Sequence, residues 1–180
     1  GILLCVVFTC LCAIRGGDWL VPPALALTAL ADLFLLVLNR HYGVGVTFFL
    51  AVQTLYLIRL RRAGAGSALW LRTALPLLLA LAVYRLALLS PLNLLVCLYF
   101  SQLLANACLA WTVRGRRWRA FALGLTLFVG CDVCVGIFNL PGLLPDALYQ
   151  FSRIGMWLFY LPSQVLIALS ALPEEKESSP

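Results

Sequence analysis

The sequence predicts an all-α fold, a polytopic bundle of transmembrane helices. The hydrophobic fraction is 63%, the charged fraction is 11% and the mean hydropathy is +1.01, whereas soluble domains are about half apolar and about a quarter charged. Apolar runs that approach the roughly 20 residues of a membrane crossing follow one another along the chain. Arginines lie in the short segments between them and orient the helices. The net charge of +6 therefore does not indicate a nucleic-acid partner.

Seven helices are expected in this chain, at residues 1–14, 19–38, 44–60, 69–89, 92–113, 120–139 and 147–172. Pro22 and Pro23 fall in the first turn of the second helix, where proline is tolerated. Residues 1–172 form one bundle, and residues 173–180 form a polar tail. The first range is short for a crossing and the chain begins with Gly, so we expect an upstream segment that holds the rest of this helix and a first helix before it.

The arginines predict the orientation of the bundle. Nine arginines follow the first, third and fifth helices, and the alternate loops contain Arg40 alone. The nine are Arg15, Arg59, Arg61, Arg62, Arg72, Arg114, Arg116, Arg117 and Arg119. This bias places the basic loops and the C-terminal tail in the cytoplasm. The protein is then a multi-pass protein of the plasma membrane or the endoplasmic reticulum.

Two carboxylates lie inside apolar runs, Asp32 in residues 25–39 and Asp132 in residues 125–139. Each precedes an asparagine, Asn39 or Asn139, by two helical turns, so each Asp and Asn share a helix face. Both aspartates are expected at one level, roughly 10 Å below the outer boundary. A charged group at this depth costs at least a few kcal/mol and is a functional-site hypothesis by default.

Other polar residues are expected near these aspartates. Arg85 and Arg153 are expected at about the same depth as the aspartates, in the outer part of the membrane. The residues expected nearer the midplane are Gln53, Tyr56, Tyr99, Gln102 and Tyr160, and those expected deeper are Gln164 and Asn106. The structural alternative is that the aspartates pair with Arg85 and Arg153 as charge-neutralising contacts. The functional alternative is a polar cavity open to the outer leaflet, in which one carboxyl group acts as acid and the other as base.

The seven cysteines all lie in apolar runs and are interpreted as small buried residues. Cys131 and Cys134 form a CxxC pair, but His41 is the one histidine and no second pair is present. We therefore expect no metal site and no cofactor.

Three stretches resemble the lysoplasmalogenase (YhhN-like) family of membrane proteins. Residues 29–60, ALADLFLLVLNRHYGVGVTFFLAVQTLYLIRL, are similar to the family's Gly-Asp helix, Gly-containing turn and His-x-x-Tyr helix. Residues 128–140, FVGCDVCVGIFNL, are similar to its Phe-x-x-Ser-Asp segment. Residues 159–172, FYLPSQVLIALSAL, are similar to its Tyr-x-x-Ala-Gln helix. The three occur in the family's order and spacing.

The resemblance implies a helical bundle, which has eight helices in the family. It also implies an enzyme that hydrolyses the vinyl-ether bond of lysoplasmalogens, a class of lysophospholipid. The products are a fatty aldehyde and a glycerophospho-base. The family's aspartates map onto Asp32 and Asp132, its tyrosines onto Tyr56 and Tyr160, and its glutamine onto Gln164. The expected partners are this substrate and the surrounding membrane lipids, with a lipid phosphate held by Arg85 or Arg153.

The sequence departs from the family pattern at Ala31, Cys131 and Gln53. The family has Gly, Ser and His at these positions. Glutamine cannot transfer a proton near neutral pH. An inactive or divergent protein that binds or transports lipid is therefore the second hypothesis, and a purely structural bundle with salt-bridged aspartates is the third.

Overall fold

A computed structural model describes the chain except residues 39, 141, 143 and 174–180. In the described part, seven α-helices and one π-helical segment are present and strands are absent, which confirms the predicted fold class. The helices are α1 (Ile2–Arg15), α2 (Val21–Asp32), α3 (Tyr42–Arg62), α4 (Leu69–Arg85), α5 (Pro91–Ala110), α6 (Arg116–Phe138) and α7 (Asp146–Leu169), and the π segment is η1 (Leu33–Val37).

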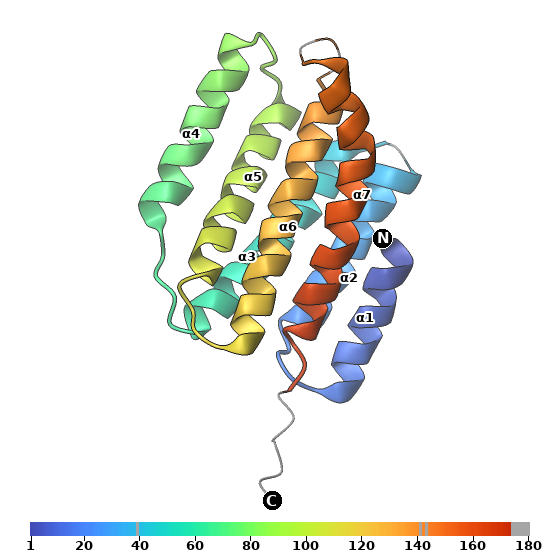
Figure 1. Ribbon diagram of the computed structural model, residues 1–180. Coiled ribbons are helices and arrows are strands. Elements are labelled where there is room, and N and C mark those ends of the chain that lie inside the picture. Colours follow the sequence, from blue (N-terminus) through green and yellow to red (C-terminus); the bar gives the residue numbers. More distant parts are fainter. Residues whose placement is uncertain (39, 141, 143, 174–180) are drawn as a thin grey trace, which may run out of the picture.

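The helices run alternately up and down in one bundle (Figure 1). We call the end that contains the α1–α2, α3–α4 and α5–α6 connections the basic end, because most of the arginines lie there. α6 packs closely against α7, and α1 lies beside α2 and α7. α4 packs against α5 and forms one outer edge of the bundle. A Cβ atom on Gly124 of α6 would lie 3.1 Å from the backbone oxygen of Ser163, so glycine permits the close α6–α7 contact.

Local sequence explains several helix ends. α5 starts at Pro91 after Ser90, whose hydroxyl accepts a hydrogen bond from the backbone N–H of Asn93 at 3.1 Å, as expected of an N-cap. The sequence predicted that the fourth helix ends at residue 89, but α4 ends at Arg85. Ala87, just beyond this end, has a φ of 55°. α6 begins at Arg116 instead of residue 120. The connection between α5 and α6 is therefore shorter than the predicted one between residues 113 and 120, because arginine is a good helix former.

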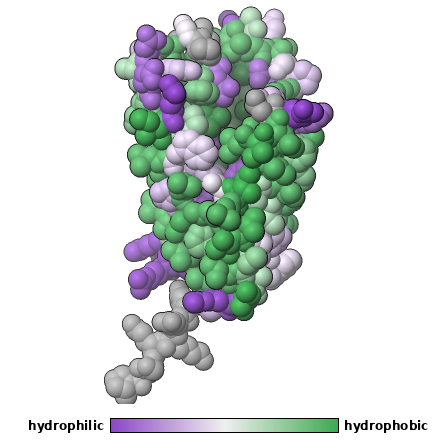
Figure 2. All heavy atoms as spheres, turned by 90° about the vertical axis from the view of Figure 1, so that its right-hand side faces the viewer, coloured by the Kyte–Doolittle hydropathy of each residue, from purple (hydrophilic) through white to green (hydrophobic). Residues whose placement is uncertain are grey.

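The surface of the bundle is that of a membrane protein. Three described helices, α3, α5 and α6, are long and apolar enough to cross a membrane, and α1 and Val21–Val37 are shorter apolar helices. Large apolar side chains project outward, such as Trp70 (73% exposed) and Ile154 (72%). Figure 2 shows a broad hydrophobic surface with hydrophilic residues gathered toward its two ends. Such a band is expected where lipid tails, not water, contact the protein.

Two arginines that the sequence assigned to loops lie inside the bundle. Arg59 belongs to the last turn of α3 and is 1% exposed, and Arg72 belongs to the first turns of α4 and is also buried. Their interpretation as loop residues was wrong, because each guanidinium has polar partners from neighbouring helices that offset the cost of burial.

Candidate functional site

Asp32 lies at the junction between α2 and the π-helical segment η1. The Leu38 N–H donates to the Leu33 carbonyl at 2.9 Å, which closes the wider turn. Such π segments are frequent at functional sites. The Asp32 side chain is 3% exposed, and Tyr160 Oη of α7 donates to its Oδ2 at 2.5 Å. The hydroxyl of Tyr160 also lies 3.8 Å from Cys5 Sγ of α1.

Asp132 has a matching arrangement on the neighbouring pair of helices. Tyr99 Oη of α5 donates to Asp132 Oδ2 of α6 at 2.5 Å. Each of the two aspartates therefore has a tyrosine hydroxyl from another helix as its hydrogen-bond donor.

Aromatic rings connect the two Asp–Tyr pairs. Phe49 of α3 stacks on Tyr99 with ring centroids 5.5 Å apart, and it meets Phe128 of α6 edge to face at 5.6 Å. Phe128 in turn meets Tyr160 at 6.0 Å. These four rings form what we call the aromatic layer. Because offset and edge-to-face pairs are favourable and packed rings have little freedom, the layer fixes both tyrosine hydroxyls in position.

Three buried side chains of the predicted site have polar atoms without a hydrogen-bond partner in the described part of the chain. They are Gln53 Nε2, Tyr56 Oη and Gln164 Oε1. Gln53 and Tyr56 lie one turn apart on α3, and Gln164 lies one turn beyond Tyr160 on α7. An unpartnered buried polar atom costs about 1–3 kcal/mol, so each of the three is a place where a water molecule or a ligand atom would supply a missing hydrogen bond.

Three predicted site residues, Arg85, Arg153 and Asn139, are exposed on the surface of the bundle. Arg85 is exposed at the end of α4, and Arg153 is exposed on α7 two turns before Tyr160. The ion pairs in the described residues involve Asp18, so the predicted pairing of the aspartates with these two arginines is not found. Asn139 is exposed and donates to the Val135 carbonyl of its own helix. Asn39 lies outside the described residues.

Comparison with known families identifies the chain. A model described as the YhhN family matches residues 1–171. The chain belongs to the YhhN family. This is the lysoplasmalogenase family, as the sequence motifs predicted. No curated protein and no solved structure matches the chain.

The YhhN bundle also contains a polar cluster at the basic end, which the sequence motifs did not reveal. Arg59 Nε donates to Asp18 Oδ2 at 2.6 Å, and Arg59 Nη1 and Nη2 donate to the hydroxyl and carbonyl of Ser170 at 2.8 and 2.7 Å. The guanidinium also lies 4.3 Å from the Phe121 ring centroid. Arg117 comes within 3.9 Å of the same carboxylate. Asp18 lies between the first two predicted helical ranges, 1–14 and 19–38.

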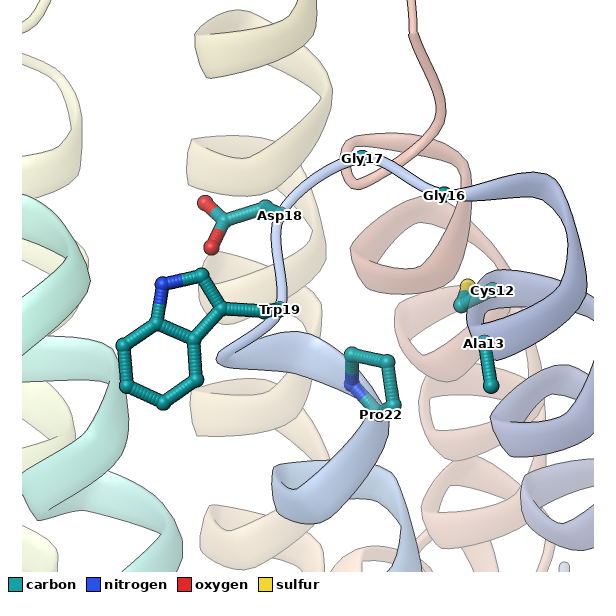
Figure 3. A pocket seen from close by; sticks show the side chains of 7 residues that line it. All are labelled: Cys12, Ala13, Gly16, Gly17, Asp18, Trp19 and Pro22. Atoms are coloured by element: carbon teal, nitrogen blue, oxygen red, sulfur yellow. The ribbon is translucent and has the colours of Figure 1, made fainter.

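A cavity of about 290 Å³ adjoins this cluster. Figure 3 shows the Asp18 carboxylate turned toward α3 and α6, away from Cys12 and the α1 side of the cavity. A second hollow, at Gly43, Val44, Thr47, Phe48 and Leu95, lies at the other end of the bundle. Neither is lined by Asp32 or Asp132. No group of three or more potential metal-ligating side chains was found in the described residues.

Proposed function

We propose that this YhhN-family membrane protein is a hydrolase that cleaves the vinyl-ether bond of lysoplasmalogens. The observation that carries the proposal is the pair of intramembrane carboxyl groups, Asp32 and Asp132, each held by a tyrosine hydroxyl and free of arginine ion pairs within the described residues. A structural role predicts neutralised carboxylates. Tyrosine donors instead fix the direction of each carboxyl group and leave its other oxygen available to a substrate.

The reaction suits two carboxyl groups and water. A proton moves from one carboxylic acid to the β-carbon of the vinyl ether, and an oxocarbenium ion forms at the carbon bonded to oxygen. The second group, as a carboxylate, stabilises this cation and removes a proton from the attacking water. The resulting hemiacetal breaks down to a fatty aldehyde and a glycerophospho-base. Asp32 and Asp132 share these two roles in our proposal.

The lipid enters, in this proposal, from the end opposite the basic end. Figure 2 shows the face that is at the right of Figure 1, and its upper half is hollowed, with hydrophilic atoms between the hydrophobic ones. Arg153 lies two turns from Tyr160 along α7 toward this end, at a level where it can hold the lipid phosphate. Arg85 is less suitable because α4 and α7 lie on different sides of the bundle. We place the basic end in the cytoplasm.

Aldehyde release from a lysoplasmalogen by the purified chain in detergent tests the proposal. Asp132→Asn and Asp32→Asn should each remove the activity, because an amide neither donates the proton nor stabilises the cation. Asp146→Asn is the matched control, since Asp146 is exposed in the first turn of α7. Full hydrolysis by either variant of the two site aspartates would refute the assigned chemistry.

A divergent lipid-binding protein is the second candidate, and Gln53 is the observation that favours it. Its side-chain oxygen accepts a hydrogen bond from Asn106, so the residue at the position of the family histidine serves as a fixed amide. This candidate predicts that lysolipid binds without aldehyde release. Measured binding together with absent turnover would select it over the hydrolase.

A further inference from the structure

The start of α1 closes one side of the Asp32–Tyr160 pair, whose members come from α2 and α7 (Figure 1). Cys5 of α1 is fully buried, and its Sγ lies 3.8 Å from Tyr160 Oη. A Cβ atom on Gly1, one turn earlier, would lie 2.8 Å from Asp32 Oδ2 and 2.9 Å from a ring carbon of Tyr160. α1 therefore meets the pair directly, although the sequence indicated Cys5 only as a small buried residue.

The hydrogen-bonding capacity of tyrosine decides which of these groups donates to which. A tyrosine hydroxyl has one proton, and in Tyr160 that proton goes to Asp32 Oδ2 at 2.5 Å. Sulfur is a weak acceptor, so it does not compete with a carboxyl oxygen for this proton. The Cys5 thiol is then the donor and Tyr160 Oη the acceptor. The three groups form a row of two hydrogen bonds, and in buried surroundings such linked bonds strengthen one another.

The pair at Asp132 has no such third group. Tyr99 Oη donates to Asp132 Oδ2, but no second hydrogen-bond partner of this hydroxyl is present in the part of the chain that the structure describes. The two Asp–Tyr pairs are therefore not equivalent, and the Cys5 thiol is the difference between them.

A second cysteine on α1 separates packing from hydrogen bonding to the site. Cys12 lies two turns after Cys5, on the same face of the helix, and it is also buried. Its thiol donates to the backbone carbonyl of Ala168 of α7 at 3.6 Å. Both thiols thus join α1 to α7, but Cys5 contacts the side chain of a site residue and Cys12 contacts the backbone.

We propose that Cys5 is a positioning residue, whose thiol donates a hydrogen bond to Tyr160 Oη and thereby holds Tyr160 as the donor to Asp32. Its effect on the reaction rests on the proposed hydrolase function, whereas the hydrogen bond itself does not require turnover. The inference makes α1 a third helix of the site at Asp32, beside α2 and α7.

Infrared absorption of the S–H stretch tests the hydrogen bond in the purified protein in detergent. A thiol that donates a hydrogen bond absorbs at a lower frequency than a free thiol. The chain has seven cysteines, so the Cys5 band is isolated as the difference between wild type and Cys5→Ala. The same difference in a Tyr160→Phe background should give a band at higher frequency, because phenylalanine offers no acceptor oxygen. The Cys12 band, isolated with Cys12→Ala, should have one frequency in both backgrounds.

The rate of aldehyde release tests the positioning role. Cys5→Ala should lower kcat by about fivefold, the effect of about one hydrogen bond, and leave KM almost unchanged. Cys12→Ala should leave kcat close to that of wild type. In the Tyr160→Phe background Cys5→Ala should have no further effect on kcat, because the acceptor of the thiol is already absent.

A Cys5 band with the same frequency in both backgrounds would overturn the proposal, and so would equal losses of kcat in Cys5→Ala and Cys12→Ala. If Cys5→Ala does not fold, Cys5→Ser takes its place in the infrared experiment, because it also lacks the S–H group. Absence of aldehyde release from the wild type would refute the hydrolase function and leave the infrared result standing. The two proposals therefore fail in distinguishable ways.

Discussion

Replacement of Arg59 by methionine should strongly destabilise the bundle. The guanidinium is 1% exposed and donates to Asp18 and twice to Ser170, and it lies against the rings of Phe121 and Trp118 at 4.3 and 4.9 Å. These contacts join the end of α3 to the α1–α2 turn, the end of α7 and the start of α6. Methionine retains much of the apolar contact but none of the donors.

The size of the loss follows from what is left behind. Removal of one partner of a buried ion pair costs about 3–5 kcal/mol. Asp18 remains 14% exposed, keeps a hydrogen bond from the Leu20 N–H and has Arg117 within 3.9 Å. We therefore expect a value near the lower limit, about 3 kcal/mol. With roughly 2–4 °C per kcal/mol for a chain of this size, the melting temperature should fall by roughly 6–12 °C.

Thermal unfolding in one detergent, followed by circular dichroism, measures this loss. Arg61→Met is the matched control, because Arg61 lies two residues away on α3 and is exposed. Its effect should stay within about 0.5 kcal/mol. A double-mutant cycle with Asp18→Asn isolates the pair, and the double variant should be more stable than the sum of the single losses predicts. Equal melting temperatures for Arg59→Met and Arg61→Met would refute the reasoning.

Three further predictions concern the site and the packing around it. Tyr99→Phe and Tyr160→Phe should each lower the rate of aldehyde release by about tenfold or more while the protein remains folded, because each removes the donor that orients one carboxyl group; unchanged rates would exclude that role. Gln53→His restores the residue type of the family and should raise the rate, and a rate equal to or below that of the wild type would show that the histidine is not needed for proton transfer in this chain. Gly124→Ala should lower the melting temperature, because its Cβ would lie 2.9 Å from Ile167. Gly136→Ala is the control and should leave the melting temperature unchanged, because its Cβ would have no atom within 4 Å. A lower melting temperature for Gly136→Ala than for Gly124→Ala in a thermal scan would contradict the α6–α7 packing.

The sequence predicted the helices well because hydropathy is a property of each segment. The seven helical segments lie where the apolar runs are, with ends displaced by a few residues where arginine or a residue with positive φ decides the boundary. It also indicated Asp32 and Asp132, since a carboxylate in an apolar run is conspicuous. The π segment after Asp32 has no comparable signal, because its pattern of apolar residues matches an α-helix.

The partners of the polar groups were less predictable. The sequence placed Arg85 and Arg153 at the level of the aspartates, but level says nothing about the direction in which a side chain points. Both arginines are exposed. The buried cations are instead Arg59 and Arg72. The sequence analysis had counted both among the loop arginines that orient the helices in the membrane. That pattern counts charges near helix ends, so it does not distinguish an arginine in solvent from one inside the bundle.

By itself, therefore, the sequence determined the family, the order of the helices and their apolar, membrane-protein character, and it indicated the residues that we propose for the site. Only the tertiary structure decided that Tyr160 donates to Asp32, 128 positions away, and that Asn106 donates to Gln53, 53 positions away. The physical reason is rotational. Each of these contacts depends on the rotation of two helices about their axes, and that rotation is set by the packing of the whole bundle, not by either segment.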